Sequence, residues 1–257
     1  MTDRPASPGP QIELATKPPG LLFERLVLQF DNEPLVQIDG DSFPAGEITC
    51  LLGTSGVGKS TLLRAIAGLV QPEAGTIKAT DNAALSGRVG FMTQQDGLLP
   101  WLSVWRNVAL GDRLRGMAPN RDRAIELLDS LGLADVVDHL PYTLSGGMRQ
   151  RVALARVLYE DRPIILMDEP FSALDAVTRD RLQSMTVERL AGRTVVLVTH
   201  DPLEALRVGH SIRVLGGKPA TLSDPITPDT APPRSLTDAT LTSRHGSLMA
   251  QLQGAAV

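Results

Sequence analysis

A glycine-rich segment near residue 55 carries the strongest chemical pattern in this sequence. It fits the spacing G-x-x-x-x-G-K-[ST], and an apolar run at residues 48–52 leads into it. Its glycines allow a tight turn whose N–H groups point at one anion, and the following helix start adds unpaired donors. We expect Lys59 to reach the β- and γ-phosphates of a nucleoside triphosphate and Ser60 to ligate Mg²⁺. The residues expected to contact the nucleotide here are Gly53, Thr54, Ser55, Gly56, Val57, Gly58, Lys59, Ser60 and Thr61.

Two adjacent carboxylates follow a second apolar run. Residues 164–167 are apolar throughout, which is typical of a buried parallel strand, and Asp168 and Glu169 come directly after them. Ligands of α/β proteins bind at the carboxyl edge of the sheet, where these two residues would lie. An Asp–Glu pair after a strand is usually a solvated loop, but the phosphate loop upstream favours function. We expect Asp168 to hold Mg²⁺ and Glu169 to deprotonate the attacking water, worth roughly 10²–10⁴ in rate.

A third pattern is the sequence LSGGMRQR at residues 144–151, which precedes a predicted helix. Ser145 is a good N-cap, and Gly146 and Gly147 expose N–H groups at the positive end of that helix. The segment is therefore a second candidate anion site. Taken alone, Ser-Gly-Gly is also an ordinary capped loop, so its interpretation depends on the other motifs.

The elements that must position these motifs alternate between short apolar runs and helical periods, which predicts an α/β domain with a mostly parallel sheet. The predicted strands are residues 21–29, 48–52, 89–92, 164–167, 194–198 and 212–215. The predicted helices are residues 60–68, 122–131, 146–159 and 177–190. Residues 94–157 show no strand signal, so we expect a helical subdomain inserted there. The first strands, up to about residue 38, are expected to be antiparallel edge strands.

Composition describes an ordinary folded chain between two proline-rich ends. The chain has 257 residues, enough to bury a large core, and its single cysteine, Cys50, excludes an intramolecular disulfide. A net charge of −4 argues against a protein that binds nucleic acid. No apolar run approaches the ~20 residues that span a bilayer. Proline clusters predict a flexible tail over residues 1–19, a catalytic domain over 20–217 and a flexible or loosely docked tail over 218–257.

Together these motifs make the chain resemble the ATP-binding cassette (ABC) ATPases over nearly all of residues 21–216. Three further residues match that family: Gln94 the Q-loop glutamine, Asp175 the D-loop aspartate and His200 the switch histidine. Gln95 is the alternative to Gln94. The implied fold is a P-loop NTPase of the RecA-like type, with a mostly parallel sheet, an antiparallel β subdomain and an inserted helical subdomain.

The same resemblance implies ATP and Mg²⁺ as cofactors and a head-to-tail homodimer in the ATP state. Two ATP molecules would lie between the phosphate loop of one subunit and residues 145–147 of the other, with Asp175 organising the interface. His200 would contact the γ-phosphate, and Gln94 would sense Mg²⁺ and the attacking water. The family places an aromatic ring on the adenine where this chain has Phe30; from the residues alone, Phe30 could equally belong to the core.

An apolar segment after Gln94 narrows the resemblance to importers. Residues 98–101 read Leu-Leu-Pro-Trp, and Trp101 after a proline is hard to bury, whereas Val104 and Val108 are expected in the core. With GGMRQR and MDEPFSALD, this segment is similar to bacterial importers of the nitrate, sulfonate and taurine group, and importers of thiamine precursors carry similar ATPases. The resemblance implies a contact with transmembrane permease subunits near Gln94 to Trp101, and through them with a substrate-binding protein.

These partners imply a cytoplasmic subunit held on the inner face of the cell membrane. A soluble ABC ATPase outside transport, such as an assembly factor, is the alternative. One segment departs from the importer pattern: residues 208–211 read Val-Gly-His-Ser where Ala-Asp-Arg is usual, which leaves a local contact open.

Overall fold

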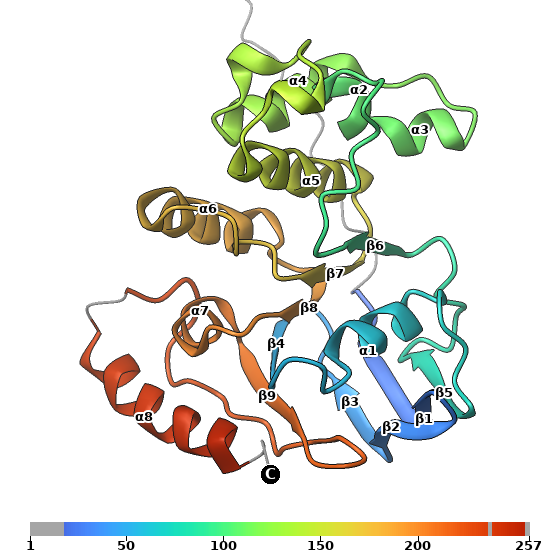
Figure 1. Ribbon diagram of the computed structural model, residues 1–257, viewed down its shortest axis with the longest axis vertical. Coiled ribbons are helices and arrows are strands. Elements are labelled where there is room, and N and C mark those ends of the chain that lie inside the picture. Colours follow the sequence, from blue (N-terminus) through green and yellow to red (C-terminus); the bar gives the residue numbers. More distant parts are fainter. Residues whose placement is uncertain (1–17, 236–237, 255–257) are drawn as a thin grey trace, which may run out of the picture.

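The larger of two sheets contains the parallel strands that the sequence predicts. The protein is described from a computed structural model that covers residues 18–235 and 238–254. In spatial order, the strands of this sheet are β10 (Thr221–Leu222), β9 (Ser211–Gly216), β4 (Ile48–Leu52), β8 (Thr194–Val198), β7 (Ile164–Asp168) and β6 (Val89–Met92). Neighbouring strands run parallel, except that β10 pairs antiparallel with β9. The predicted α/β fold class is therefore confirmed, and Figure 1 shows how the chain surrounds this sheet.

Helices and the smaller sheet cover the two faces of the larger sheet. On β4, Leu51 faces α1 and the smaller sheet, whereas Cys50 and Leu52 face the opposite side, where α5, α6, α7 and α8 pack. Because successive side chains of a strand point to opposite faces, both faces of β4 are buried. The covering helices are α1 (Lys59–Ile66), α5 (Gly146–Glu160), α6 (Ala176–Arg189), α7 (Pro202–Val208) and α8 (Ala239–Gly254).

The antiparallel β subdomain is a separate sheet of four strands. Its strands are β1 (Leu21–Phe30), β2 (Glu33–Ile38), β3 (Asp41–Phe43) and β5 (Ala74–Ala79). β1 pairs antiparallel with each of the other three, so the predicted antiparallel pairing is confirmed, but these strands do not lie at the edge of the main sheet. β3 and β5 escape prediction because β3 has three residues and β5 is mostly exposed, without apolar alternation.

Between β6 and the end of α5 the described chain contains helices and turns but no strand, as the sequence predicts. The helices before α5 are α2 (Val104–Val108), α3 (Leu110–Leu114) and α4 (Arg121–Ser130), followed by 3₁₀ turns at Ala134–Val136 and Pro141–Thr143. Val104 and Val108 are fully buried, as expected, and Trp101 is 71% exposed. None of the described helices is long and apolar enough to cross a membrane.

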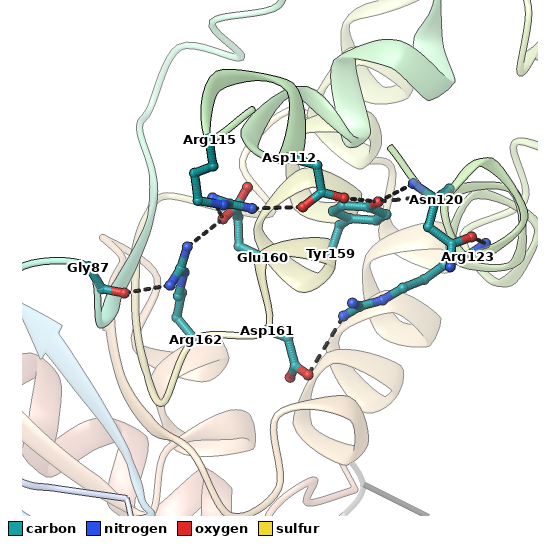
Figure 2. Close-up of polar contacts among 9 residues, drawn as sticks. All are labelled: Gly87, Asp112, Arg115, Asn120, Arg123, Tyr159, Glu160, Asp161 and Arg162. Carbon is teal, nitrogen blue, oxygen red and sulfur yellow. Dashed lines mark hydrogen bonds and ion pairs between the residues drawn. The ribbon is translucent and has the colours of Figure 1, made fainter. Parts of the chain in front are cut away.

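A network of charged side chains joins this helical subdomain to the main sheet (Figure 2). Arg115, just after α3, pairs with Asp112 at 2.9 Å and with Glu160, the last residue of α5, at 2.6 Å. Glu160 also accepts from Arg162, at 3.3 Å, and Arg162 donates to the backbone carbonyl of Gly87 before β6. The end of α5 is thereby tied both to its own subdomain and to the sheet.

The C-terminal segment is packed against the body, which corrects the expectation of a flexible or loosely docked tail. Leu241 and Leu248 of α8 are each 2% exposed and belong to the main core. Arg234 is almost fully buried and donates to the carbonyls of Leu206 and Gly209 at the end of α7, both at 2.7 Å. Two leucines seven residues apart among Thr, Ser and Gly give a weak helical signal. Residues 1–17 of the predicted N-terminal tail lie outside the described residues.

The segment that departs from the importer pattern has its own contacts. A Cβ on Gly209 would lie 2.9 Å from the Cys50 sulfur, so only glycine allows this close approach of α7 to β4. His210 accepts a hydrogen bond from the N–H of Ile48 through Nδ1 at 3.1 Å, and burial lowers the pKa of His210. Arg234, from the C-terminal segment, satisfies the carbonyl of Gly209.

Candidate nucleotide-binding site

The candidate site residues lie after four strands that are adjacent in the main sheet. The phosphate loop follows β4, His200 follows β8, Asp168 and Glu169 lie at the end of β7, and Gln94 follows β6. Because these strands are parallel neighbours, their carboxyl ends share one edge. Residues up to 147 positions apart in sequence thus meet at one place.

The phosphate loop is closed around its own lysine. Lys59 is 8% exposed, and its Nζ donates to the carbonyls of Gly53 at 2.7 Å and Thr54 at 2.8 Å. Burial lowers the pKa of Lys59, while the carboxylates of Glu169 and Asp168 oppose this shift. Gly58, the N-cap of α1, has a φ of 110° that side chains rarely adopt, and this conformation turns the chain into the helix.

A buried carboxylate lies beside the hydroxyl that ends the motif. Asp168 is 5% exposed, and desolvation by burial raises its pKa, while a side-chain hydrogen bond with Ser60 lowers it. Lys59 lies near enough to lower the same pKa. A carboxylate and a hydroxyl are hard oxygen ligands, so this pair fits Mg²⁺.

Glu169 contacts two of the other predicted residues. Its Oε1 lies 3.2 Å from Nδ1 of His200, and its Oε2 accepts from Nε2 of Gln94 at 3.4 Å. The His200 side chain is 65% exposed, whereas that of Glu169 is 20% exposed. Of the two neighbouring glutamines, it is therefore Gln94 that contacts Glu169. The three side chains form a cluster that can accept a proton and contact an incoming anion.

Phe30 lies in a groove beside the phosphate loop. The groove has a volume of about 690 Å³, and Phe30, Pro34, Thr54 and Val57 are among the residues that line it. Phe30 is 66% exposed, so it does not belong to the core. An exposed aromatic ring next to the phosphate loop is available for stacking on a base.

The segment LSGGMRQR at residues 144–151, called the signature below, leads into α5 and lies away from this groove. Ser145 caps the helix by accepting from the N–H of Met148 at 3.2 Å, as predicted. A Cβ on Gly146 would meet nothing within 4 Å, whereas one on Gly147 would lie 3.1 Å from the carbonyl of Ala173. Gly146 therefore faces open space, and a second molecule can approach it.

Asp175 of the predicted D-loop caps the next helix. Its carboxylate accepts from the N–H of Thr178 at 3.0 Å, and this backbone hydrogen bond lowers the pKa of Asp175. A groove of about 470 Å³ lies between the D-loop, the start of α5 and Gln94. Within one chain, the structure thus places the signature beside the D-loop and Gln94, not beside the phosphate loop.

Sequence reasoning gave Gln150 no role, although it lies inside the signature pattern. Its side chain is buried and hydrogen-bonds to the backbone of Glu169 and Ala173. In the sequence, Gln150 is distinguished only as a polar residue in a predicted helix that carries an apolar face.

Comparisons with known proteins identify one family. The model of the ABC transporter family matches residues 40–172. The aliphatic sulfonates import ATP-binding protein SsuB 2 of Burkholderia cenocepacia (strain HI2424) is 44% identical over 217 residues, covering 81% of this chain and 78% of that protein. SsuB 1 of Pseudomonas syringae pv. syringae (strain B728a) is 41% identical, covering 84% and 89%.

A similar solved structure is the dimer of an ATP-binding cassette in a post-hydrolysis state with ADP and Pi. It is 30% identical, with a TM-score of 0.69, and covers 84% of this chain and 100% of that one. The chain therefore belongs to the ABC transporter family. Within that family it is one of the ATP-binding subunits, an ATPase.

Proposed function

We propose that this chain is the ATP-hydrolysing subunit of a bacterial importer of aliphatic sulfonates. The observation that carries the ATPase part is the gathering of Lys59, Asp168 and Glu169 at one edge of the main sheet, after β4 and β7, which lie on either side of β8. The import part rests on relatives 44% and 41% identical whose names assign them to aliphatic sulfonate import.

ATP would bind across the phosphate loop and the groove beside it. The helix start of α1 and the N–H groups of the loop favour the phosphates, and Lys59 adds the charge. Phe30 would stack on the adenine from its exposed position at the groove. Lys59 now donates to two loop carbonyls, which are weaker acceptors than charged phosphate oxygens. When ATP binds, its phosphates would therefore replace these carbonyls as the partners of Lys59.

Mg²⁺ would be held by Ser60 and Asp168, with Gln94 as a further ligand. The fit rests on the Ser60 hydroxyl, which lies near enough to the buried Asp168 carboxylate to lower its pKa. When bound, Mg²⁺ neutralises charge that develops on the phosphate oxygens. Burial of Asp168 keeps this carboxylate fixed in a site of low dielectric.

Glu169 would accept the proton of the attacking water. Gln94 and His200 both contact its carboxylate, so they orient it from two sides. The exposed imidazole of His200 can also reach an anion outside the chain, which suits contact with the γ-phosphate. Glu169 therefore takes the proton, while His200 and Gln94 position the reacting groups.

In the ATP state the chain would form a head-to-tail homodimer. Ser145, Gly146 and Asp175 are exposed, and Gly146 has open space in front of it. The helix start there is a second anion site, so it can take the γ-phosphate of an ATP bound to the other subunit. The similar cassette structure with ADP and Pi is a dimer, which supports this arrangement.

The loop after Gln94 would contact the transmembrane permease. Trp101 is exposed at its tip, while Asn107, which is fully buried, holds the loop through the N–H of Leu99 at 2.8 Å and the carbonyl of Leu102 at 2.9 Å. An exposed indole on a loop whose backbone is held on both sides of it is a suitable anchor for a partner. The permease would place the subunit on the inner face of the membrane and link it to a substrate-binding protein.

Uptake measurements test the proposal against the alternatives. Deleting the gene for this chain should abolish uptake of a labelled aliphatic sulfonate, and the wild-type chain should restore it while Glu169→Gln should not. A tagged chain should co-purify with a permease from membranes. Unchanged sulfonate uptake, together with a chain that stays out of the membrane fraction, would instead support an ATPase outside transport.

A further inference from the structure

Gln150 is a buried amide whose two ends bind the backbone around the candidate general base. It lies on α5 and is 7% exposed. Its Nε2 donates to the carbonyl of Glu169 at 2.9 Å and to the hydroxyl of Ser172 at 3.2 Å. Its Oε1 accepts from the N–H of Ala173 at 2.9 Å. The side chain therefore spans the loop from Glu169 to Ala173.

The backbone of Glu169 needs such support. Its φ of 52° lies in the left-handed region, which is costly for any residue except glycine and persists only where surrounding contacts hold it. On one side, the N–H of Glu169 donates to the carbonyl of Val198 on β8 at 2.9 Å. On the other side, the carbonyl of Glu169 accepts from Gln150 and from the Ser172 hydroxyl at 3.1 Å. Gln150 is thus the support that comes from the helical subdomain.

The first turn of α5 contacts the same loop. A Cβ on Gly147 would lie 3.1 Å from the carbonyl of Ala173, closer than most side chains tolerate, so helix and loop are in direct contact there. A shift of the start of α5 must therefore displace the loop that carries Glu169. Ser145 and Gly146 stand at that same helix start.

We propose that Gln150 is a positioning residue for Glu169 of its own subunit. In the dimer, the signature of one subunit faces the ATP bound to the partner subunit, whereas Glu169 acts on the ATP bound to its own subunit. Gln150 links these two parts of one chain. The link between the two sites rests on the head-to-tail dimer of the proposed function, whereas the positioning of Glu169 rests on contacts within one chain.

Steady-state kinetics of Gln150→Glu tests the positioning role. The substitution is close to isosteric and keeps an oxygen for the N–H of Ala173, but it sets a carboxylate oxygen against the carbonyl of Glu169. We expect kcat to fall about ten- to a hundredfold, because small misplacements of a catalytic group cost that much. The KM for ATP should stay within about twofold of wild type.

Gln183→Glu is the matched control. Gln183 is also buried, and its amide donates to the side chain of Glu204 at 3.2 Å, which is not one of the candidate site residues. Its kcat should stay near the wild-type value even where its melting temperature falls. Wild-type kcat for Gln150→Glu, or an equal loss of kcat in the control, would overturn the proposal.

Mixed dimers show which base Gln150 serves. Consider a dimer of one Gln150→Glu subunit and one Glu169→Gln subunit. If Gln150 serves the base of its own subunit, each subunit carries a defective base, so both sites are impaired and mixing the two variants should restore no activity. If Gln150 acted through the signature that it presents to the partner, both defects would fall on one site. About half of the wild-type activity per mixed dimer would then return, which would overturn the proposal.

Ser145→Ala mixed with Glu169→Gln is the control for the dimer itself. The signature defect and the base defect fall on the same site of a head-to-tail pair, so this mixture should regain activity. If it does not, the head-to-tail dimer of the proposed function is wrong. The positioning role of Gln150 within one chain is then still decided by the kcat comparison.

Discussion

At the scale of single residues, Lys59 supplies the only side-chain cation of the phosphate loop. Lys59→Ala should abolish tight ATP binding, because the loop N–H groups alone carry no full charge. Nucleotide titration of the purified variant measures this. Lys78→Ala is a suitable control, since Lys78 is an exposed lysine that pairs with Glu24 on the β subdomain. Unchanged affinity in Lys59→Ala would contradict the assignment of the loop.

Glu169 should separate ATP binding from hydrolysis. Glu169→Gln is nearly isosteric, so the buried Asp168 and the sheet edge should be retained, while the proton acceptor is lost. We expect turnover to drop about 10²–10⁴-fold. Loss of a negative charge near the phosphates also favours the closed pair, so the variant should run as a dimer on size-exclusion chromatography with ATP and as a monomer without nucleotide.

The matched control for this variant is Glu188→Gln on the exposed side of α6. It should hydrolyse ATP like the wild type. Full activity in Glu169→Gln would refute the base assignment. A variant that binds ATP, does not hydrolyse it and never dimerises would leave the base in place but argue against the head-to-tail pair.

At the scale of elements, the loop between β6 and α2 presents Trp101 while its neighbours hold it in place. Trp101→Ala should leave the melting temperature and ATP binding nearly unchanged but weaken assembly with the permease by about 2 kcal/mol. Pull-down of the permease over a concentration series measures this loss. Val104→Ala should lower the melting temperature but leave the affinity for the permease nearly unchanged, because Val104 is fully buried in the same subdomain. A strongly destabilised Trp101→Ala that still assembles would make Trp101 a core residue.

Helix α7 carries a buried carboxylate whose titration should be visible in stability. Burial raises the pKa of Glu204 from its ordinary 4.5 to about 7. Between these values the folded state binds more protons than the unfolded state, so the free energy of unfolding falls as pH rises, by at most about 1.4 kcal/mol per pH unit. Glu204→Gln has no titrating group at this position, so it should not show this decrease in the free energy of unfolding.

Urea unfolding at pH 5, 6 and 7 measures the effect. The stability of Glu204→Gln relative to the wild type should increase across this range. A difference that does not change with pH would show that Glu204 is ionised in the folded protein at pH 5.

At the scale of the whole molecule, the C-terminal segment completes the main core. Leu248 on α8 is almost fully buried, so Leu248→Ala should lower the free energy of unfolding by about 2–5 kcal/mol. Gln251→Ala, at an exposed position of the same helix, should change it by less than about 0.5 kcal/mol. Equal stability of the two variants in urea unfolding would mean that α8 is not docked in solution.

Local patterns in the sequence predicted the chemistry of single motifs and the elements beside them. Lys59 and Ser60 follow a predicted strand at a fixed spacing, and local spacing is enough to build an anion site at a helix start. The predicted strands of the main sheet match the observed ones to within a residue at each end, because buried parallel strands are continuous apolar runs. Short or exposed elements such as β3, β5 and α7 leave no such pattern.

Which distant residues meet depends on how the strands and helices pack together. Gln94 and Glu169 are 75 residues apart and contact each other because β6 and β7 are parallel neighbours, and strand order is not written in local periodicity. The exposure of Phe30 and the burial of Leu248 depend likewise on what packs against them. Gln150 is one polar residue in a helix until the fold brings the backbone of Glu169 within 2.9 Å of its amide.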